Sequence, residues 1–253
     1  MGVKAKDWAD FWNQPHSIYV NRRHLDVHYR DIAEHVRQLL PAGKPRVLDY
    51  GCGEAIHAGL VADSAAELVL CDAAPGVRDR LVQRFAGNTK IRVLAPDEVD
   101  RLPAQSFDFM FVNSVVQYVP PAQVGRLLGA WRRLLAPDGA IIIADIIPPH
   151  VGPLRDAVAL ARYAAKNQFL LAAMVGCVRT FFSAYRRARS DFGVATYTES
   201  EFLQRLATNG LVGVRLPFNL EHNPARMTFR VRLGRLPGEG TEALGTKLPS
   251  DGE

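Results

Sequence analysis

Between residues 29 and 144, short apolar runs alternate with segments whose apolar side chains recur at helical spacing. The last of these runs, residues 140–144, is apolar enough to be a central strand covered on both faces. Strands that alternate with helices in this rhythm predict a parallel sheet. The expected strands are residues 46–48, 68–71, 91–94, 107–112 and 140–144, and the expected helices are residues 29–40, 54–64, 75–85 and 122–135.

The pattern changes in the second half of the chain. Residues 148–195 form a long interruption that starts at a Pro-Pro pair and is rich in Ala, Leu, Phe and Arg. The capping box Thr198–Glu201 then opens a helix that stops at Asn209-Gly210. Two more strands are expected at residues 212–216 and 226–233, and the strict polar and apolar alternation of the second is typical of a strand near a sheet edge.

The segment Val47-Leu-Asp49-Tyr-Gly51-Cys-Gly53 joins the first expected strand to the next helix. Its two glycines let the backbone turn tightly and approach a ligand where a β-carbon would obstruct it. A dinucleotide fingerprint needs a third glycine at position 56, where this chain has Ile56, and the sequence has no Gly-Lys-Ser/Thr phosphate loop. The junction therefore predicts a ligand with a nucleoside and an amino-acid end but no phosphates, bound beyond the carboxyl end of a strand.

Composition limits the class of protein. The 253 residues are 48% hydrophobic and 23% charged, which is ordinary for a globular chain with a substantial core. The three cysteines lack disulfide or metal-ligand spacing, and residues 1–10 lack the apolar core of a secretory signal, so we expect a reducing, cytoplasmic setting. The net charge of +5 is modest, and without a large basic face interleaved with aromatics we expect no nucleic-acid partner.

With these elements placed, the chain resembles the class I S-adenosylmethionine-dependent methyltransferases from about Trp8 to Leu233. The resemblance is carried by the glycine-rich junction, by the acidic end of the second strand at Asp72, and by residues 102–108 and 133–139 before the fourth and fifth strands. The most similar branch acts on small molecules and includes quinone-pathway C-methyltransferases. The resemblance implies S-adenosylmethionine as the cofactor and a small, apolar or lipid-like methyl acceptor.

The resemblance also implies an α/β fold. This is a Rossmann-like, doubly wound, seven-stranded and mostly parallel sheet with one antiparallel strand, and with a helical insertion between strands five and six. Residues 1–233 then form a single methyltransferase domain, in which residues 1–44 cap the site and residues 148–195 form a helical lid. Gly, Pro, Glu, Thr and Ser dominate residues 234–253, which we expect to be a disordered tail.

Nine matched positions form the cofactor site that the resemblance implies. Asp49 anchors the ammonium group of the methionyl part, and Asp72 accepts both ribose hydroxyls, because a carboxylate offers several acceptor sites to two neighbouring donors. An ordinary strand-to-helix turn, with a helix cap at Asp72, would account for the same residues without a ligand. The nine are Asp49, Gly51, Cys52 and Gly53 around the methionyl part, Asp72 and Ala73 at the ribose, Asp97 at the adenine amino group, and Asn113 and Ser114 beside the sulfonium.

The methyl acceptor is expected on the other side of the sulfonium. If the acceptor is a phenol or an activated carbon, a base must take its proton, whereas an amine or thiol needs only positioning. The expected substrate contacts are Gln117, Tyr118 and His222, and Gln117 stands where many relatives have His. The candidates for the catalytic group are His24, Tyr19, a water held by Gln117, and His222.

His24 and His28 lie four residues apart and share one face of a helix, as two metal ligands would. No third ligand with convincing spacing accompanies them, and the chain has no HExxH motif. The sequence therefore predicts no metal ion. The two imidazoles would instead pack on the helix or help to cover the bound cofactor.

The interruption at residues 148–195 has two interpretations. Its longest uncharged run, residues 167–178, is too short to span a bilayer. The interruption is either a lid that shapes the acceptor site or a helical insertion packed on the edge of the sheet. As a lid it would touch a membrane surface through Arg179, Arg186, Arg187 and Arg189.

Three other functions stay open at this stage. A nicotinamide-dependent oxidoreductase would use the same type of sheet, but Ile56 disfavours it. A non-catalytic S-adenosylmethionine-binding module would keep the cofactor site and lack an acceptor pocket under residues 148–195. A membrane-surface protein would act through the arginines near residue 180. The sequence leaves the acceptor, the choice of O-, N-, C- or S-methylation and the oligomeric state undetermined.

Overall fold

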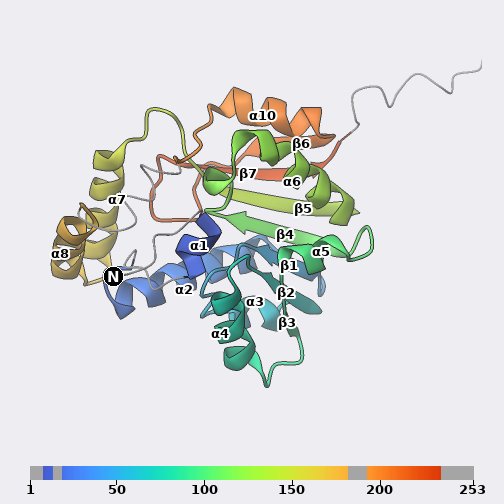
Figure 1. The fold of residues 1–253 in the computed structure, drawn as a ribbon, viewed down its shortest axis with the longest axis horizontal. Helices are drawn as coiled ribbons and strands as arrows, with labels where there is room; N and C mark the ends of the chain where they lie inside the picture. Colours follow the sequence, from blue (N-terminus) through green and yellow to red (C-terminus); the bar gives the residue numbers. More distant parts are fainter. Residues whose placement is uncertain (1–7, 14–18, 182–192, 235–253) are drawn as a thin grey trace, which may run out of the picture.

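The computed structural model describes residues 8–13, 19–181 and 193–234 of the chain (Figure 1). Its seven-stranded sheet has the order β3-β2-β1-β4-β5-β7-β6, in which β7 alone is antiparallel to its neighbours. The fold that the resemblance implies is therefore confirmed, including the single antiparallel strand. The strands are β1 (Arg46–Tyr50), β2 (Glu67–Cys71), β3 (Ile91–Leu94), β4 (Phe107–Asn113), β5 (Leu135–Ile146), β6 (Leu211–Arg215) and β7 (Met227–Leu233).

Helices cover both faces of the sheet, and each face has its own apolar core. Ile141 and Ile143 of β5 enter one core, whereas Ile142 and Ala144 enter the other. This double burial explains why the sequence of β5 is continuously apolar rather than alternating. The first core is covered by α5 (Pro96–Asp100), α6 (Pro121–Leu134) and α10 (Glu199–Thr208), and the second by α2 (Arg22–Leu39), α3 (Ala58–Asp63) and α4 (Pro75–Phe85).

The junction after β1 differs from the sequence prediction. The next helix begins at Ala58, four residues later than the predicted start at Glu54. Ala55 has a φ of 38°, which is outside the right-handed helical region, and the Glu54 amide donates a hydrogen bond of 2.8 Å to the Tyr29 hydroxyl. A turn therefore replaces the first part of the predicted helix and brings the glycine-rich loop against α2.

Strand β5 begins at Leu135, five residues before the expected strand at residues 140–144. Residues 137–139, whose Pro-Asp-Gly sequence is typical of a turn, are part of an irregular stretch of the strand. Phe107 pairs with Leu135, whereas Phe109 pairs with Ala140, so β5 carries extra residues between the two pairs. Turn-forming residues therefore made a bulge rather than a loop.

The insertion after β5 contains α7 (Pro153–Lys166) and α8 (Leu170–Phe181), as predicted for a helical insertion. These helices lie beside α2 and away from the edge of the sheet (Figure 1). Val27 of α2 packs with Ala164 of α7 and Phe169 of the connecting turn in a small separate core. The insertion is therefore attached to the segment that precedes β1.

None of the helices in the described part of the chain is long and apolar enough to cross a membrane. Helices α7 and α8 nevertheless leave several large apolar side chains in solvent, among them Leu154, Leu171, Met174 and Val175. The predicted basic contacts Arg186, Arg187 and Arg189 and the predicted tail from residue 235 onward lie outside the described residues, as does the side chain of Arg179.

Candidate functional site

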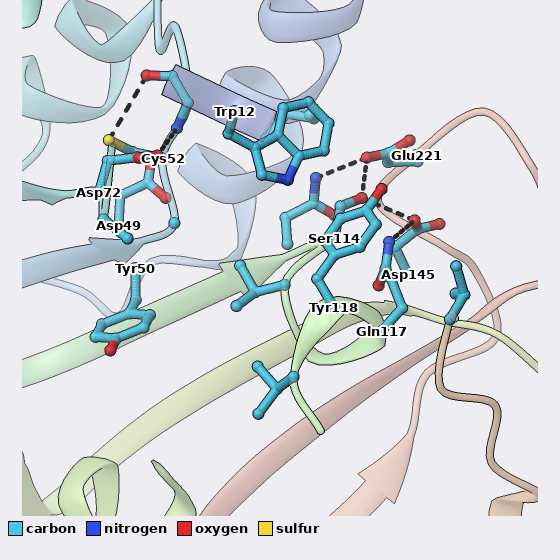
Figure 2. A pocket seen from close by; sticks show the side chains of 18 of the residues that line it. Trp12, Asp49, Tyr50, Cys52, Asp72, Ser114, Gln117, Tyr118, Asp145 and Glu221 are labelled. Carbon is cyan, nitrogen blue, oxygen red and sulfur yellow. Dashed lines mark hydrogen bonds between the residues drawn. The ribbon is translucent and has the colours of Figure 1, made fainter. Parts of the chain in front are cut away.

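A cavity of about 1650 Å³ opens beside the carboxyl ends of β1, β2, β4 and β5. In Figure 2, Trp12 lies between its two ends, with Asp49 and Asp72 on one side and Asp145 and Glu221 on the other. The cavity brings together all but one of the residues that the sequence predicts for the site. They are Tyr19, His24, Asp49, Gly51, Cys52, Gly53, Asp72, Ala73, Asn113, Ser114, Gln117, Tyr118 and His222.

Asp49, near the end of β1, is a buried carboxylate to which no described residue donates a hydrogen bond. Burial, and then the charge of Asp72, raise its pKa well above the usual range. A buried carboxylate is stable as an anion only beside a cation or hydrogen-bond donors. No positive group of the described residues faces this carboxylate, and an ammonium group of a ligand would supply one.

Asp72 follows β2 and accepts two backbone hydrogen bonds. The Gly53 amide donates to Oδ2 at 3.0 Å, and the Ala74 amide donates to Oδ1 at 2.8 Å. The second bond joins Asp72 to the amide two residues later, as in an Asx turn. Helix α4 has Ala74 as its N-cap and no side-chain cap, so the interpretation of Asp72 as the helix cap is wrong. The two bonds do not exclude a ligand, because each carboxylate oxygen keeps a further acceptor position.

Gly51 and Gly53 both have positive φ, of 79° and 56°. A β-carbon at Gly51 would collide with Cγ2 of Val115, and one at Gly53 would lie 2.5 Å from the hydroxyl oxygen of Tyr29. The loop is thus held between α2 and the residues that follow β4. Glycine is required there for the backbone conformation and for the space.

Replacing Gly51 with alanine is expected to lower the free energy of unfolding by about 1–2 kcal/mol, because an L-residue at positive φ is strained. The same change should weaken binding of S-adenosylhomocysteine, since the loop must move away from Val115. Urea unfolding and calorimetric titration measure the two effects. Gly129→Ala is the matched control: its β-carbon meets nothing in mid-helix, so stability should rise by about 0.5–1 kcal/mol. Equal effects of the two changes would contradict the prediction.

The structure does not bring Asp97 to the cavity. Its carboxylate is 65% exposed and pairs with Arg101 at 2.8 Å on the surface of α5. Helix α5 was not predicted, and it places Pro96 and Asp100, four residues apart, on the side that lines the cavity.

At the opposite end of the cavity, three predicted residues hold two carboxylates that sequence reasoning missed. The Asn113 side chain donates a hydrogen bond of 2.9 Å to Glu221 Oε1, and the Ser114 hydroxyl lies 2.5 Å from the same oxygen. Ser114 also lies 2.7 Å from Asp145 Oδ2, to which the Gln117 amide donates at 3.2 Å (Figure 2). These polar side chains therefore orient buried carboxylates at the end of β4 and β5.

Aromatic and imidazole rings gather next to Glu221. The ring of His24 lies 6.2 Å from that of His28 and 6.4 Å from that of His222. The Tyr19 ring lies 5.5 Å from His24 and 5.3 Å from His28. The predicted common face of His24 and His28 on one helix is confirmed, and the loop before β7 brings a third histidine to it.

His24 and Tyr19 are uncharged hydrogen-bonding groups in this site. The Val20 amide donates to His24 Nδ1 at 3.3 Å, which assigns the ring proton to Nε2, a buried atom without a partner among the described residues. Burial lowers the pKa of His24 to about 4. The Tyr19 hydroxyl donates to the Tyr29 hydroxyl at 3.1 Å, and burial raises the pKa of Tyr19 well above its usual range.

Arg226 connects the sheet to the inserted helices. Its guanidinium lies 2.5 Å from Asp145 Oδ2 and 3.0 Å from Asp156 Oδ2 of α7. Asp145 is 1% exposed, and burial, followed by the charge of Glu221, raises its pKa to about 6 despite Arg226. The position of Asp145 directly after residues 140–144 was a signal that could have identified it, because ligand sites lie beyond strand ends.

Sequence comparison identifies a methyltransferase domain in residues 48–143. The chain is 28% identical over 138 residues to protein-L-isoaspartate O-methyltransferase of Methanoculleus marisnigri. This match covers 53% of this chain and 56% of the relative. It is 30% identical over 210 residues to a probable non-canonical nonribosomal peptide synthetase, CymA of Salinispora arenicola, which covers 77% of this chain and 2% of that protein. The chain thus spans about half the length of the first relative and a small part of the second.

Structural comparison agrees with the sequence match. The DhpI–SAH complex matches with a TM-score of 0.57 and 14% identity, over 91% of this chain and 97% of that one. Together the fold and the matched domain are those of the class I S-adenosylmethionine-dependent methyltransferases. S-adenosylmethionine is the cofactor of this class. The Asp49 carboxylate, which has no partner in the described part of the chain, and the glycine-lined loop fit its ammonium and methionyl groups.

Proposed function

We propose that this chain transfers the methyl group of S-adenosylmethionine to a small-molecule acceptor. The observation that carries the proposal is the buried Asp49 carboxylate, which has no cationic partner among the described residues and lies beside the glycine-lined loop. A pyrophosphate at the glycine-lined loop would be repelled by Asp49, which argues against a nicotinamide cofactor. Asp72 does not discriminate, because an acidic residue at the end of the second strand also binds the ribose of NAD.

Each end of the cofactor has matching residues in the proposed complex. Asp49 holds the ammonium group, backbone groups of residues 51–53 surround the methionyl part, and Asp72 accepts the ribose hydroxyls. Asn113 and Ser114 lie at the acceptor end of the cavity, where both contact Glu221. The bound cofactor supplies an electrophilic methyl group; the residues around it bind, orient and exclude water.

The acceptor would lie between Tyr118, Trp12 and the histidines. Trp12 and Tyr118 make an edge-to-face contact with ring centroids 5.4 Å apart, and together they restrict the cavity between its two ends. As the new bond to the acceptor forms, the methyl–sulfur bond breaks and the sulfur keeps the electron pair. Holding acceptor and methyl group in line accounts for most of the rate in such a displacement.

The proton of a hydroxyl or carbon acceptor must also leave. His24 Nε2 carries a proton and would orient the acceptor as a donor. The Tyr19 hydroxyl already donates to Tyr29, and the Gln117 amide donates to Asp145. His28, Glu221 and His222 remain at this end of the cavity to receive the proton or stabilise the acceptor anion.

Helix α7 supports the proposed role of residues 148–195 as a lid. Pro153, Asp156, Ala157 and Leu160 of this helix line the cavity opposite the sheet. Their mixed and mostly apolar character suits a small acceptor with an apolar body. Residues 1–233 would then act as one methyltransferase domain, with the segment before β1 and the insertion closing the site together.

A methyl-transfer assay tests the proposed function. The chain is incubated with S-adenosylmethionine labelled in the methyl group and with lipid quinols, phenols or small amines, and label in each acceptor is measured. We expect transfer to an acceptor with an ionisable hydroxyl and loss of transfer in Asp49→Ala. Binding of S-adenosylhomocysteine without label in any acceptor class would favour a non-catalytic binding module instead.

The contact with a membrane surface stays a prediction, and the exposed apolar side chains of α8 favour it. Leu171 is 81% exposed and Met174 is 60% exposed. Cosedimentation with anionic vesicles is therefore expected to fall when Leu171 is changed to Asp. Val212→Asp, at an exposed position on β6, is the control and should have no effect. Vesicle binding that is absent in the wild type, or equal in both variants, would contradict this role.

A further inference from the structure

Two histidines and one glutamate converge at the acceptor end of the cavity. His28 comes from α2, and Glu221 and His222 come from the loop before β7. One possible ligand atom from each of the three lies within 4.8 Å of the others. All three residues line the cavity, so any group bound between them would be accessible to an acceptor.

Glu221 and His222 approach each other without making a hydrogen bond. Glu221 Oε2 and His222 Nδ1 are 4.0 Å apart, and His222 Nδ1 is buried with no hydrogen-bond partner among the described residues. Zinc lies about 2.0–2.2 Å from oxygen and nitrogen ligands, so two ligands of one tetrahedral ion are roughly 3.3–3.6 Å apart. The three ligand atoms lie within 4.8 Å of one another, so they must move closer by up to about 1.5 Å when one ion binds between them.

Neighbouring side chains hold the possible ligands in place. Asn113 and Ser114 both contact Glu221 Oε1 and leave Oε2 for another partner. The His222 ring stacks on Tyr163, with centroids 5.0 Å apart and an interplanar angle of 24°. Support of this kind around carboxylate and imidazole groups is typical of metal sites, where it fixes the ligands before the ion binds.

The local charges also favour a cation. The hydrogen-bonded network contains the carboxylates of Glu221, Asp145 and Asp156 but only one guanidinium, that of Arg226. Among the described residues of this network, three carboxylates and one guanidinium leave two negative charges in excess at a largely buried place. Buried charge without compensation is costly, and a bound cation removes that cost.

We propose that His28, Glu221 and His222 bind one divalent transition-metal ion, such as Zn²⁺ or Fe²⁺, with open positions toward the cavity. Two imidazoles and one carboxylate suit these ions, whereas Mg²⁺ and Ca²⁺ prefer sites made of oxygen ligands alone. Sequence spacing could not identify this set, because Glu221 and His222 lie far from His28 in the sequence.

The proposed metal site also limits the chemical class of the methyl acceptor. This extension rests on the proposed methyl transfer. An acceptor hydroxyl bound to the ion would have a lowered pKa, because a cation stabilises the oxygen anion. The proton would leave to solvent or to a nearby base, and the anionic oxygen would face the methyl group. An acceptor with a hydroxyl that can coordinate a metal is therefore favoured over an amine.

Metal binding can be measured without an acceptor. The full chain is stripped with a chelator, dialysed and titrated calorimetrically with Zn²⁺, and its metal content is determined after further dialysis. The wild type is expected to bind one equivalent. Glu221→Gln and His28→Ala should each lower the affinity at least about 10-fold, as loss of groups in metal sites does. His150→Ala, an exposed residue outside the cavity, is the control and should bind as the wild type does.

Titration of each variant with S-adenosylhomocysteine separates the outcomes. Retained cofactor binding shows that the variant is folded, so a selective loss of Zn²⁺ supports the metal site. Absence of stoichiometric Zn²⁺ binding by the wild type, or equal affinity in Glu221→Gln and wild type, overturns it and leaves the proposed methyl transfer standing. Stoichiometric Zn²⁺ binding by a wild-type chain that does not bind S-adenosylhomocysteine would support the metal site and contradict the proposed methyl transfer.

Discussion

Changing Asp72 to alanine is expected to weaken S-adenosylhomocysteine binding by roughly 100-fold or more. In the proposed complex the carboxylate accepts two ribose hydroxyls, and hydrogen bonds to a charged group contribute about 1.5–3 kcal/mol each. Two such bonds correspond to about 3 kcal/mol at least, which is a factor of roughly 100 in the dissociation constant. Calorimetric titration of the wild type and the variant measures this difference.

Asp97→Ala is the matched control for that experiment. Asp97 is also an aspartate close to a strand end, but its side chain is exposed, pairs with Arg101 and does not line the cavity. The control is expected to bind S-adenosylhomocysteine as the wild type does. Since Asp72→Ala also removes the acceptor of the Gly53 and Ala74 amides, its unfolding is measured in parallel and the titration is done where it is fully folded. Similar affinities for Asp72→Ala and wild type would refute the ribose role.

Changing Arg226 to methionine is expected to lower the free energy of unfolding by about 3–5 kcal/mol. The guanidinium is the cationic partner of Asp145 and Asp156, and breaking a buried pair from one side leaves an uncompensated charge. The variant should also detach α7 from the sheet and thereby raise the KM for the acceptor more than that for the cofactor. Urea unfolding measures the first effect, and steady-state kinetics measures the second.

The control for Arg226 is Arg215→Met, which removes a guanidinium from an exposed pair with Glu199. Exposed ion pairs contribute about 0–1 kcal/mol, so this change should have little effect.

The loss of stability in Arg226→Met should also become smaller as the pH falls. Burial and Glu221 raise the pKa of Asp145 to about 6, and loss of the guanidinium raises it further. Protonation in the folded state then removes the uncompensated charge, so stability should rise as the pH is lowered through this range. A loss that does not depend on pH would assign the effect to packing.

Much of the sheet could be predicted from sequence because its signals are local. Helix α4 begins at Pro75 and β3 spans Ile91–Leu94, as the proline position and the apolar run indicate. The boundaries failed where a tertiary contact decides the backbone. The Tyr29 hydroxyl holds the turn at Glu54 in place of a helix, and Tyr29 is far from that turn in sequence.

The two ends of the cavity also differ in how far they could be predicted from sequence. Asp49 and Asp72 follow apolar strands, and the carboxyl ends of parallel strands meet at one edge, so their proximity follows from the pattern. Glu221 and Arg226 lie in a loop before the antiparallel strand, without any local motif. Only the pairing of β7 with β5 brings them to Ser114 and Asp145, so the acceptor end became visible only in three dimensions.

The central claim is that the cavity binds S-adenosylmethionine and no nicotinamide cofactor. Calorimetric titration of the wild-type chain with S-adenosylmethionine, S-adenosylhomocysteine and NADH tests it most directly. We expect the first two to bind with one-to-one stoichiometry and to exclude each other, and we expect NADH to produce no binding heat and no competition. Binding of NADH in competition with S-adenosylhomocysteine, or no binding of either sulfur compound, would contradict the account.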